Sequence, residues 1–269
     1  MNNDRILEYF FTIGDFAHAT AYTYTGRYMQ WKIMNFVLKS FVKEAKRFNN
    51  RPLRVLDIGC NNGDLIFHIS NMYPGYYFTG VDINSCLIAY ANKRADFRQD
   101  KRIKFFEGDC EHLNFDSKSF DIIIITDVLE HLLNPEMAVK EIYRLLDDTG
   151  LAIISVPNGN NLFEYSFMKS LKRVISSRLI FKPRYDKEKG DGYSRGHVSM
   201  FSRRKWIRLF EEQHLQVKGY QRGAMFYGGN WIDGRRILFA ACLFLDVILD
   251  RLPIFNDFTE NLLFNLRKM

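Results

Sequence analysis

The sequence predicts an α/β fold: a doubly wound, Rossmann-like sheet with helices on both faces and a helical insertion after the fifth strand. Two observations carry this prediction. From about residue 53, short β-rich runs alternate with helical patterns, which is typical of βαβ units. The run FDIIIIT at 120–126 contains four consecutive isoleucines, as expected for a central strand that is buried on both faces.

The predicted elements alternate from the first strand onward. Asn84 or Ser85 follows the second strand and is expected to cap the next helix, because both side chains accept hydrogen bonds from N–H groups of a first turn. After Pro157 the alternation stops for roughly 40 residues, which indicates an insertion. The expected strands are 53–58, 76–82, 103–109, 120–126, 150–157 and 215–220, and the expected helices are 62–73, 84–97, 135–146 and 202–213.

Four segments are expected along the chain. Residues 1–50 are predicted to form an aromatic-rich, helical N-terminal lid, and residues 51–222 the main domain. Within that domain, 158–200 form a basic insertion whose first half has the pattern of a basic amphipathic helix. Residues 223–269 are predicted to be an apolar helical extension.

Composition restricts the class of protein. With 269 residues, 47% hydrophobic and 26% charged, the chain is expected to be globular. The first residues carry Asp4 and Glu8 and lack an apolar secretory core, so a cytoplasmic location is expected. The apolar run 237–245 is too short to span a membrane. Four scattered cysteines without a CxxC pair indicate neither a zinc site nor a disulfide framework, and no metal is predicted.

The net charge of +7 is concentrated in one segment. Residues 165–208 hold 13 Lys and Arg against three acids, whereas the rest of the chain is slightly acidic. A basic segment of this kind favours an anionic small-molecule or lipid-linked partner, or peripheral contact with an anionic membrane surface. No RNA-binding module is visible in the sequence, which disfavours nucleic acid as the partner.

The stretch VLDIGCNNGD at 55–64 combines the end of a strand, a tight turn and the start of a helix. Gly59 and Gly63 allow a ligand to approach the backbone closely at a helix N-terminus. The glycines stand four residues apart with Asn61 between them, which departs from the G-x-G-x-x-G fingerprint. A dinucleotide-dependent oxidoreductase is therefore disfavoured.

These residues resemble the first motif of the class I S-adenosylmethionine-dependent methyltransferases, acidic-x-G-x-G-x-G. DIGCNNGD matches it through Asp57, Gly59 and Gly63, with Asn61 in place of the middle glycine. Asn accepts positive φ more readily than most residues, so the substitution is tolerable. Further on, FDIIIITDVLEHLLNP looks like the corresponding segment of the ubiquinone-pathway, small-molecule enzymes. The resemblance covers 50–158 well and extends loosely to about 222.

The resemblance implies S-adenosylmethionine as cofactor and assigns roles to strand-end residues. Asp82 would bind the ribose hydroxyls, and Asp109 would lie near the adenine amine, although Glu107 and Glu111 are close enough in sequence to take that role. Thr126 would lie beside the methionine part. The expected cofactor-binding residues are Asp57, Gly59, Cys60, Asn61, Gly63, Asp82, Ile83, Asp109, Cys110 and Thr126.

The expected reaction is methyl transfer to a small-molecule or lipid-linked acceptor, with oxygen favoured and nitrogen or carbon left open. A hydroxyl acceptor needs a base, and histidine is suited to that task at neutral pH. His131 and His197 are the candidate catalytic residues, although packing behind the cofactor and helix capping are equally open roles for them. A cofactor-binding scaffold that docks on a partner or membrane without catalysis is the alternative function.

Overall fold

The computed structural model describes residues 24–49, 51–159, 197–225, 236–250, 252 and 259–269. These residues form a seven-stranded mixed sheet with the order β3-β2-β1-β4-β5-β7-β6. The strands are β1 Arg54–Ile58, β2 Tyr77–Asp82, β3 Ile103–Glu107, β4 Phe120–Thr126, β5 Leu146–Pro157, β6 Leu215–Arg222 and β7 Asn261–Lys268. The helices are α2 Tyr24–Arg47, α3 Asp64–Met72, α4 Ser85–Arg98, the short 3-10 helix η2 Leu129–His131, α5 Pro135–Leu145, α7 Arg203–Glu212 and α9 Arg236–Leu249.

The order of the strands creates a switch point between β1 and β4. The chain runs from β1 outward through β2 to β3, then returns to place β4 on the other side of β1. Strands β1 to β5 pair in parallel, so their carboxyl ends share one edge. In doubly wound sheets ligands bind at that edge, beside the switch point.

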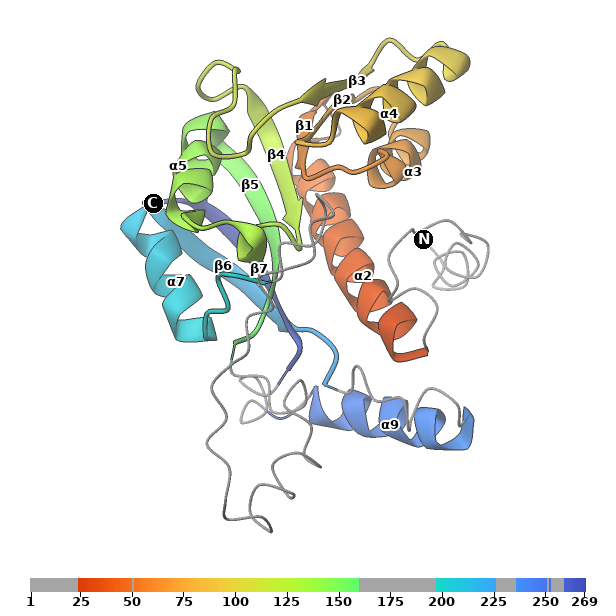
Figure 1. Ribbon diagram of the computed structural model, residues 1–269, viewed down its shortest axis with the longest axis vertical. Helices are drawn as coiled ribbons and strands as arrows, with labels where there is room; N and C mark the ends of the chain where they lie inside the picture. Colours follow the sequence, from red (N-terminus) through yellow and green to blue (C-terminus); the bar gives the residue numbers. More distant parts are fainter. Residues whose placement is uncertain (1–23, 50, 160–196, 226–235, 251, 253–258) are drawn as a thin grey trace, which may run out of the picture.

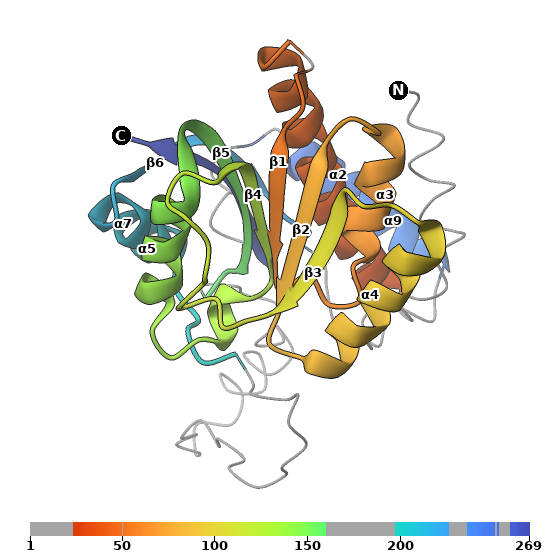
Figure 2. The same cartoon turned by 90° about the horizontal axis from the view of Figure 1, so that it is seen from above.

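Alternate residues of the central strands face two separate cores. On β4, Ile122 and Ile124 contact one apolar cluster, whereas Ile123 and Ile125 contact the other. Helices α2, α3 and α4 cover the first face, and α5 and α7 cover the second (Figure 2). The doubly wound α/β fold and the burial of FDIIIIT on both faces are thereby confirmed.

Two predictions about the ends of the chain need correction. Residues 24–47 were expected to form part of a lid. They form helix α2, which covers one face of the sheet and buries Val37, Phe41 and Ala45 against it (Figure 1). The expected helical extension is wrong at its end, since Asn261–Lys268 form strand β7 between β5 and β6. Four apolar side chains of β7 are fully buried, because a strand inside the sheet can bury apolar side chains on both of its faces.

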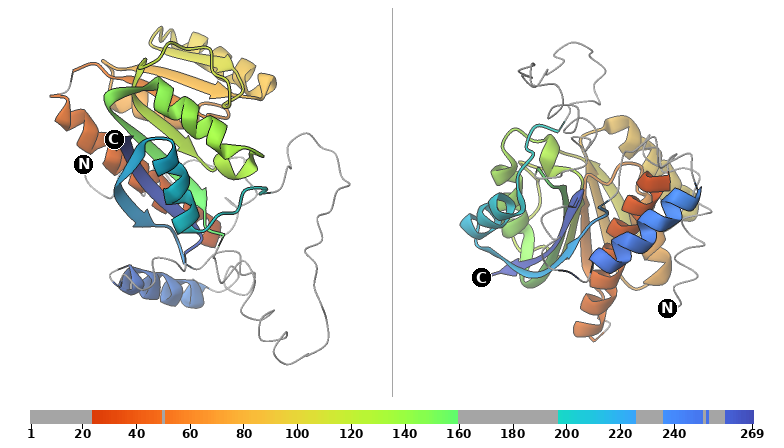
Figure 3. Two further views of the ribbon diagram at one scale, coloured as in Figure 1. Left: turned by 90° about the vertical axis from the view of Figure 1, so that its left-hand side faces the viewer. Right: turned by 90° about the horizontal axis from the view of Figure 1, so that it is seen from below.

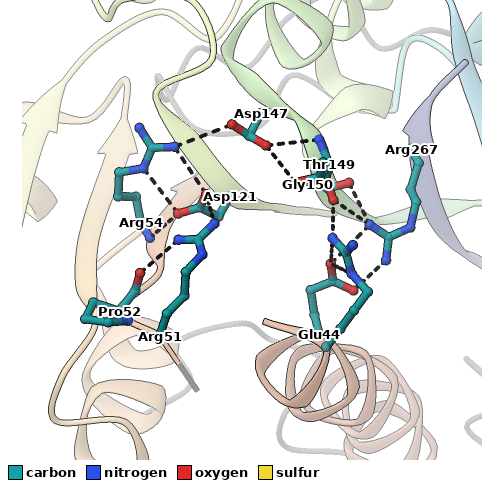
Figure 4. A network of polar contacts seen from close by, with 10 residues as sticks. Glu44, Arg51, Pro52, Arg54, Asp121, Asp147, Thr149, Gly150 and Arg267 are labelled. Atoms are coloured by element: carbon teal, nitrogen blue, oxygen red, sulfur yellow. Dashed lines mark hydrogen bonds and ion pairs between the residues drawn. The ribbon is translucent and has the colours of Figure 1, made fainter. Parts of the chain in front are cut away.

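Polar contacts tie the amino ends of the strands to α2 and β7 (Figure 4). Glu44 of α2 is buried, and its Oε2 accepts a hydrogen bond of 2.5 Å from Nη2 of Arg267 in β7. At the start of β4, the buried carboxylate of Asp121 accepts hydrogen bonds from the backbone N–H of Arg54 at 2.8 Å and from Nη2 of Arg51 at 3.0 Å. These contacts stabilise the edge of the sheet opposite the ligand edge.

Helix α9 lies beside the N-terminal end of α2, away from the sheet (Figures 1 and 3). Nζ of Lys32 in α2 lies 2.7 Å from Oδ2 of Asp246 in α9, and both side chains are buried. On the outer side of α9, Ile237 and Phe244 are 89% and 70% exposed. Within the described ranges, no helix combines the length and the apolar character that crossing a membrane requires.

Candidate functional site

The turn after β1 adopts the backbone conformation that its glycines allow. Gly59 and Gly63 have φ of 74° and 81°, and Asn61 has φ of 52°. The N–H groups of Gly59 and Cys60 both donate to the carbonyl of Val81, at 2.7 and 3.0 Å, which fixes the turn against the end of β2. Gly63 is the N-cap of α3 and provides no side-chain hydrogen bond, whereas the N–H of Asp64 donates to Oδ1 of Asn62 at 3.2 Å.

Asp82 lies at the end of β2 and is tied to the same turn. Its Oδ2 accepts a hydrogen bond of 2.8 Å from the N–H of Asn61, and its Oδ1 accepts one of 2.9 Å from the N–H of Asn84. Each carboxylate oxygen retains a further lone pair for a hydroxyl donor. Asn84 also caps α4, as predicted, because its Oδ1 accepts from the N–H groups of Cys86 and Leu87.

Asp57 and Cys60 are buried beneath the turn rather than presented at its surface. Asp57 is only 3% exposed, and burial, aided by the nearby charge of Asp82, raises its pKa to about 8. Burial likewise raises the pKa of the Cys60 thiol far above its ordinary value. We infer that these two side chains shape the turn from within.

The other expected cofactor residues lie along the same edge in different environments. Ile83 is 75% exposed and directly follows Asp82. Asp109 is exposed, and its Oδ1 accepts a hydrogen bond of 2.9 Å from the N–H of Glu111. The half-buried thiol of Cys110 has a pKa raised to about 12 by burial and by neighbouring acids. Thr126 ends β4 and is half-buried.

The segment after β4 packs directly on the glycine turn. A Cβ atom added to Gly59 would lie 2.2 Å from Cγ2 of Val128, so only glycine fits beneath that side chain. Asp127 has φ of 54°, and its Oδ1 accepts a hydrogen bond of 2.7 Å from Oγ of Ser155. These contacts bring the exit of β4 against the end of β1.

The two candidate catalytic histidines lie together. The ring centroids of His131 and His197 are 5.1 Å apart, with the rings inclined at 67°. The carbonyl of Glu130 accepts hydrogen bonds from the N–H groups of Val198 and Ser199 at 2.7 and 2.9 Å, which holds His197 beside η2. The sequence interpretation placed His131 just behind the cofactor and His197 near the acceptor pocket, and it did not predict their contact.

Sequence reasoning missed Glu130 and Asp127. Glu130 is 1% exposed, and burial together with the charge of Asp127 raises its pKa well above the ordinary value. The only signal was the Glu-His pair that begins four residues after a predicted strand end. The basic insertion, including Lys172 and Arg173, lies outside the described residues except at its ends.

Comparison with known proteins finds a matching family model and similar methyltransferases. A family model described as "Methyltransferase domain" matches residues 56–154, from β1 to β5. The ubiquinone/menaquinone biosynthesis C-methyltransferase of Rhodopseudomonas palustris (strain TIE-1) is 28% identical over 139 residues, which cover 48% of this chain and 55% of that protein. The ubiquinone biosynthesis O-methyltransferase of Coxiella burnetii (strain Dugway 5J108-111) is 31% identical over 156 residues, which cover 58% and 62%.

Among solved structures, PKMT2 from Rickettsia typhi in complex with AdoHcy has a similar fold. The TM-score is 0.51 at 17% identity, over 81% of this chain and 49% of that chain. This likeness shows the fold alone. The matched part of the chain spans little more than half the length of the two curated relatives.

Proposed function

We propose that this chain, which belongs to the class I S-adenosylmethionine-dependent methyltransferases, transfers a methyl group from that cofactor to a small-molecule acceptor. One observation carries the proposal: Asp82 and the turn from Gly59 to Gly63, whose glycines have positive φ, meet at the carboxyl ends of β1 and β2, beside the switch point of the sheet. The family match to residues 56–154 supports it, and so do the names of the relatives.

The residues at this edge fit the cofactor. Asp82 has carboxylate lone pairs left for two ribose hydroxyls, and such charge-assisted hydrogen bonds are the strong ones. The missing Cβ atoms of Gly59 and Gly63 let protein side chains pack directly on the turn. We assign the methionine part of the cofactor to the N-terminal end of α3, whose first turn has no side-chain cap from Gly63. We assign Asp109 and Cys110 to the adenine side and Thr126 to the methionine side. Asp57 and Cys60 support the turn from beneath.

When bound, the cofactor supplies an electrophilic methyl group on a sulfonium whose leaving thioether needs no acid. The chain therefore has to orient the acceptor and exclude water, and such positioning supplies much of the barrier reduction. A hydroxyl acceptor must also lose its proton as it reacts. We assign that task to the pair His131 and His197, because His131 lies three residues after Val128, which packs against the glycine turn, and His197 contacts His131.

We propose oxygen as the acceptor atom and a lipid-linked acceptor as the substrate class. The relatives' names include both C- and O-methyltransferases, and the pair of histidines favours the reaction that needs a base. The exposed apolar side chains of α9, Ile237 and Phe244 among them, favour an acceptor presented at a membrane surface. The excess of basic residues in the segment 165–208 favours an anionic acceptor.

Mass spectrometry tests the activity. The purified chain is incubated with methyl-deuterated S-adenosylmethionine and fractions of a cell extract, separated into aqueous and lipid phases. We expect S-adenosylhomocysteine to form and one compound of the lipid phase to gain a trideuteromethyl group. Cofactor binding without turnover in any fraction would instead support the non-catalytic scaffold.

A liposome experiment tests the membrane part of the proposal. The double variant Lys172→Glu/Arg173→Glu replaces two basic residues of the insertion. We expect weaker flotation with anionic vesicles and slower turnover of a membrane-presented acceptor. Unchanged behaviour in both measurements would remove the membrane contact while leaving methyl transfer intact.

A further inference from the structure

Three potential metal ligands gather at the exit of β4. Glu130, His131 and His197 each offer one ligand atom, and the three atoms lie within 4.8 Å of one another. Two of these residues are adjacent in η2, whereas His197 lies 66 positions later in the chain. Two imidazoles and one carboxylate can together bind a metal ion and leave further coordination positions of that ion open.

The backbone holds this cluster together. Besides the two hydrogen bonds that the carbonyl of Glu130 accepts from Val198 and Ser199, Oγ of Ser199 donates one of 2.8 Å to the carbonyl of Leu132. The segment that carries His197 is thus attached to both sides of His131. A preformed arrangement of ligands reduces the entropy that a bound ion would otherwise have to overcome.

The environment of the Glu130 carboxyl group favours a bound cation. It is buried, and its Oε2 has no hydrogen-bond partner among the described residues. Its Oε1 lies 3.8 Å from Nε2 of His131, which is too long for a hydrogen bond. A buried carboxyl oxygen without a partner is costly, and pairing it with a cation removes that cost.

We propose that Glu130, His131 and His197 hold a divalent cation of the zinc class, whose open positions bind the oxygen atom of the methyl acceptor. This inference rests on the proposed function for its acceptor and on the cluster for its ion. Imidazole ligands favour zinc and its neighbours in the first row over magnesium and calcium, which prefer oxygen ligands. Ligand bonds of about 2.1 Å require the three atoms to approach to roughly 3.0–3.4 Å, which side-chain rotation can achieve.

The place of the cluster suits this role. Val128, one residue before η2, packs on Gly59, so the ion would lie on the segment that contacts the cofactor turn. A hydroxyl bound to the ion loses its proton to water at a lower pH than a free one. Its oxygen then forms the new O–CH3 bond while the S–CH3 bond breaks and its electron pair stays on sulfur. In this scheme both histidines activate the acceptor as ligands of the ion, and the proton whose removal the proposed function assigns to the pair leaves to water instead.

Cobalt(II) absorption spectroscopy tests the site on the full chain, freed of any affinity tag. We expect one equivalent of Co2+ to give visible bands and Zn2+ to abolish them by competition. Affinity should fall on the order of 100-fold in His131→Ala and in His197→Ala, and about tenfold or more in Glu130→Gln. His112→Ala, which removes an exposed histidine outside the cluster, should bind as the wild type does.

Two controls separate the outcomes. Near-ultraviolet circular dichroism and titration with S-adenosylhomocysteine show whether each variant is folded. Wild-type protein that binds the nucleoside but not Co2+, or binding that survives in both folded histidine variants, would overturn the metal site and leave the proposed function standing. If the chain binds Co2+ but methylates no acceptor, the metal site is supported and the proposed function is contradicted.

Discussion

The backbone N–H of Asn61 donates a hydrogen bond of 2.8 Å to Oδ2 of Asp82, which joins the turn after β1 to the end of β2. The two residues stand 21 positions apart. The contact needs Asn61 at positive φ, a conformation that Asn tolerates better than most residues. One side chain thereby both orders the turn and offers its remaining lone pairs to a ligand.

Replacement of Gly59 by Ala tests the packing of that turn. The added Cβ would clash with Val128 at 2.2 Å and would sit at φ of 74°. We expect a loss of about 2–4 kcal/mol in the free energy of unfolding, measured by urea denaturation, together with weaker nucleoside binding. The matched variant Gly75→Ala has no atom near the new Cβ and should change stability by less than about 0.5 kcal/mol. Adding Val128→Ala should restore part of the loss, and no restoration would contradict the assigned clash.

The buried carboxyl group of Asp57 predicts a pH dependence of stability. Its pKa is raised to about 8, so between pH 4 and 8 the folded protein holds a proton that the unfolded chain has released. Stability contributed by this group is complete below its unfolded pKa and is lost as the pH rises toward 8. We expect a decline of up to about 1.4 kcal/mol per pH unit in that window.

The variant Asp57→Asn isolates that decline. An amide cannot titrate, so urea denaturation of this variant at pH 5 to 8 should show a shallower fall than the wild type. Asp96→Asn, at an exposed position of α4, should keep the wild-type slope. Equal slopes for the wild type and Asp57→Asn would show that Asp57 is ionised in the folded protein.

The contact between Glu44 and Arg267 tests the place of β7 in the sheet (Figure 4). Arg267→Ala leaves the buried Glu44 with Arg47 as its remaining ion-pair partner. We expect a loss of about 2 kcal/mol in the free energy of unfolding, less than the roughly 3–5 kcal/mol typical of a fully orphaned buried charge. Lys118→Ala breaks a surface pair with Asp148 and should have no measurable effect. A loss no larger in Arg267→Ala than in Lys118→Ala would show that the contact contributes nothing.

The histidine pair predicts a separation of binding from turnover. His197→Ala should lower the rate of methyl transfer by about 100-fold or more, because activation of the acceptor is lost, while affinity for S-adenosylhomocysteine stays within about twofold. Single-turnover kinetics and calorimetry on one preparation measure both quantities. An unchanged rate would assign His197 a structural role.

Local patterns predicted most of the parallel sheet. The four isoleucines of β4 and the glycines of the turn can be recognised in the sequence itself, because burial on both faces and positive φ each restrict which residues are allowed. Strand β7 was missed because its antiparallel pairing with β5 and β6 depends on segments far away in sequence. The contact of His131 with His197 and the burial of Glu130 depend on tertiary packing in the same way.

Titration calorimetry with S-adenosylhomocysteine tests the central claim, that the carboxyl edge around Asp82 binds the adenosyl cofactor. We expect one molecule to bind per chain, with wild-type affinity in Asp96→Ala. Asp82→Ala loses two charge-assisted hydrogen bonds, each worth about 1.5–3 kcal/mol, so its affinity should fall by about 100-fold or more. No heat of binding with the wild type, or full affinity in folded Asp82→Ala, would contradict the claim.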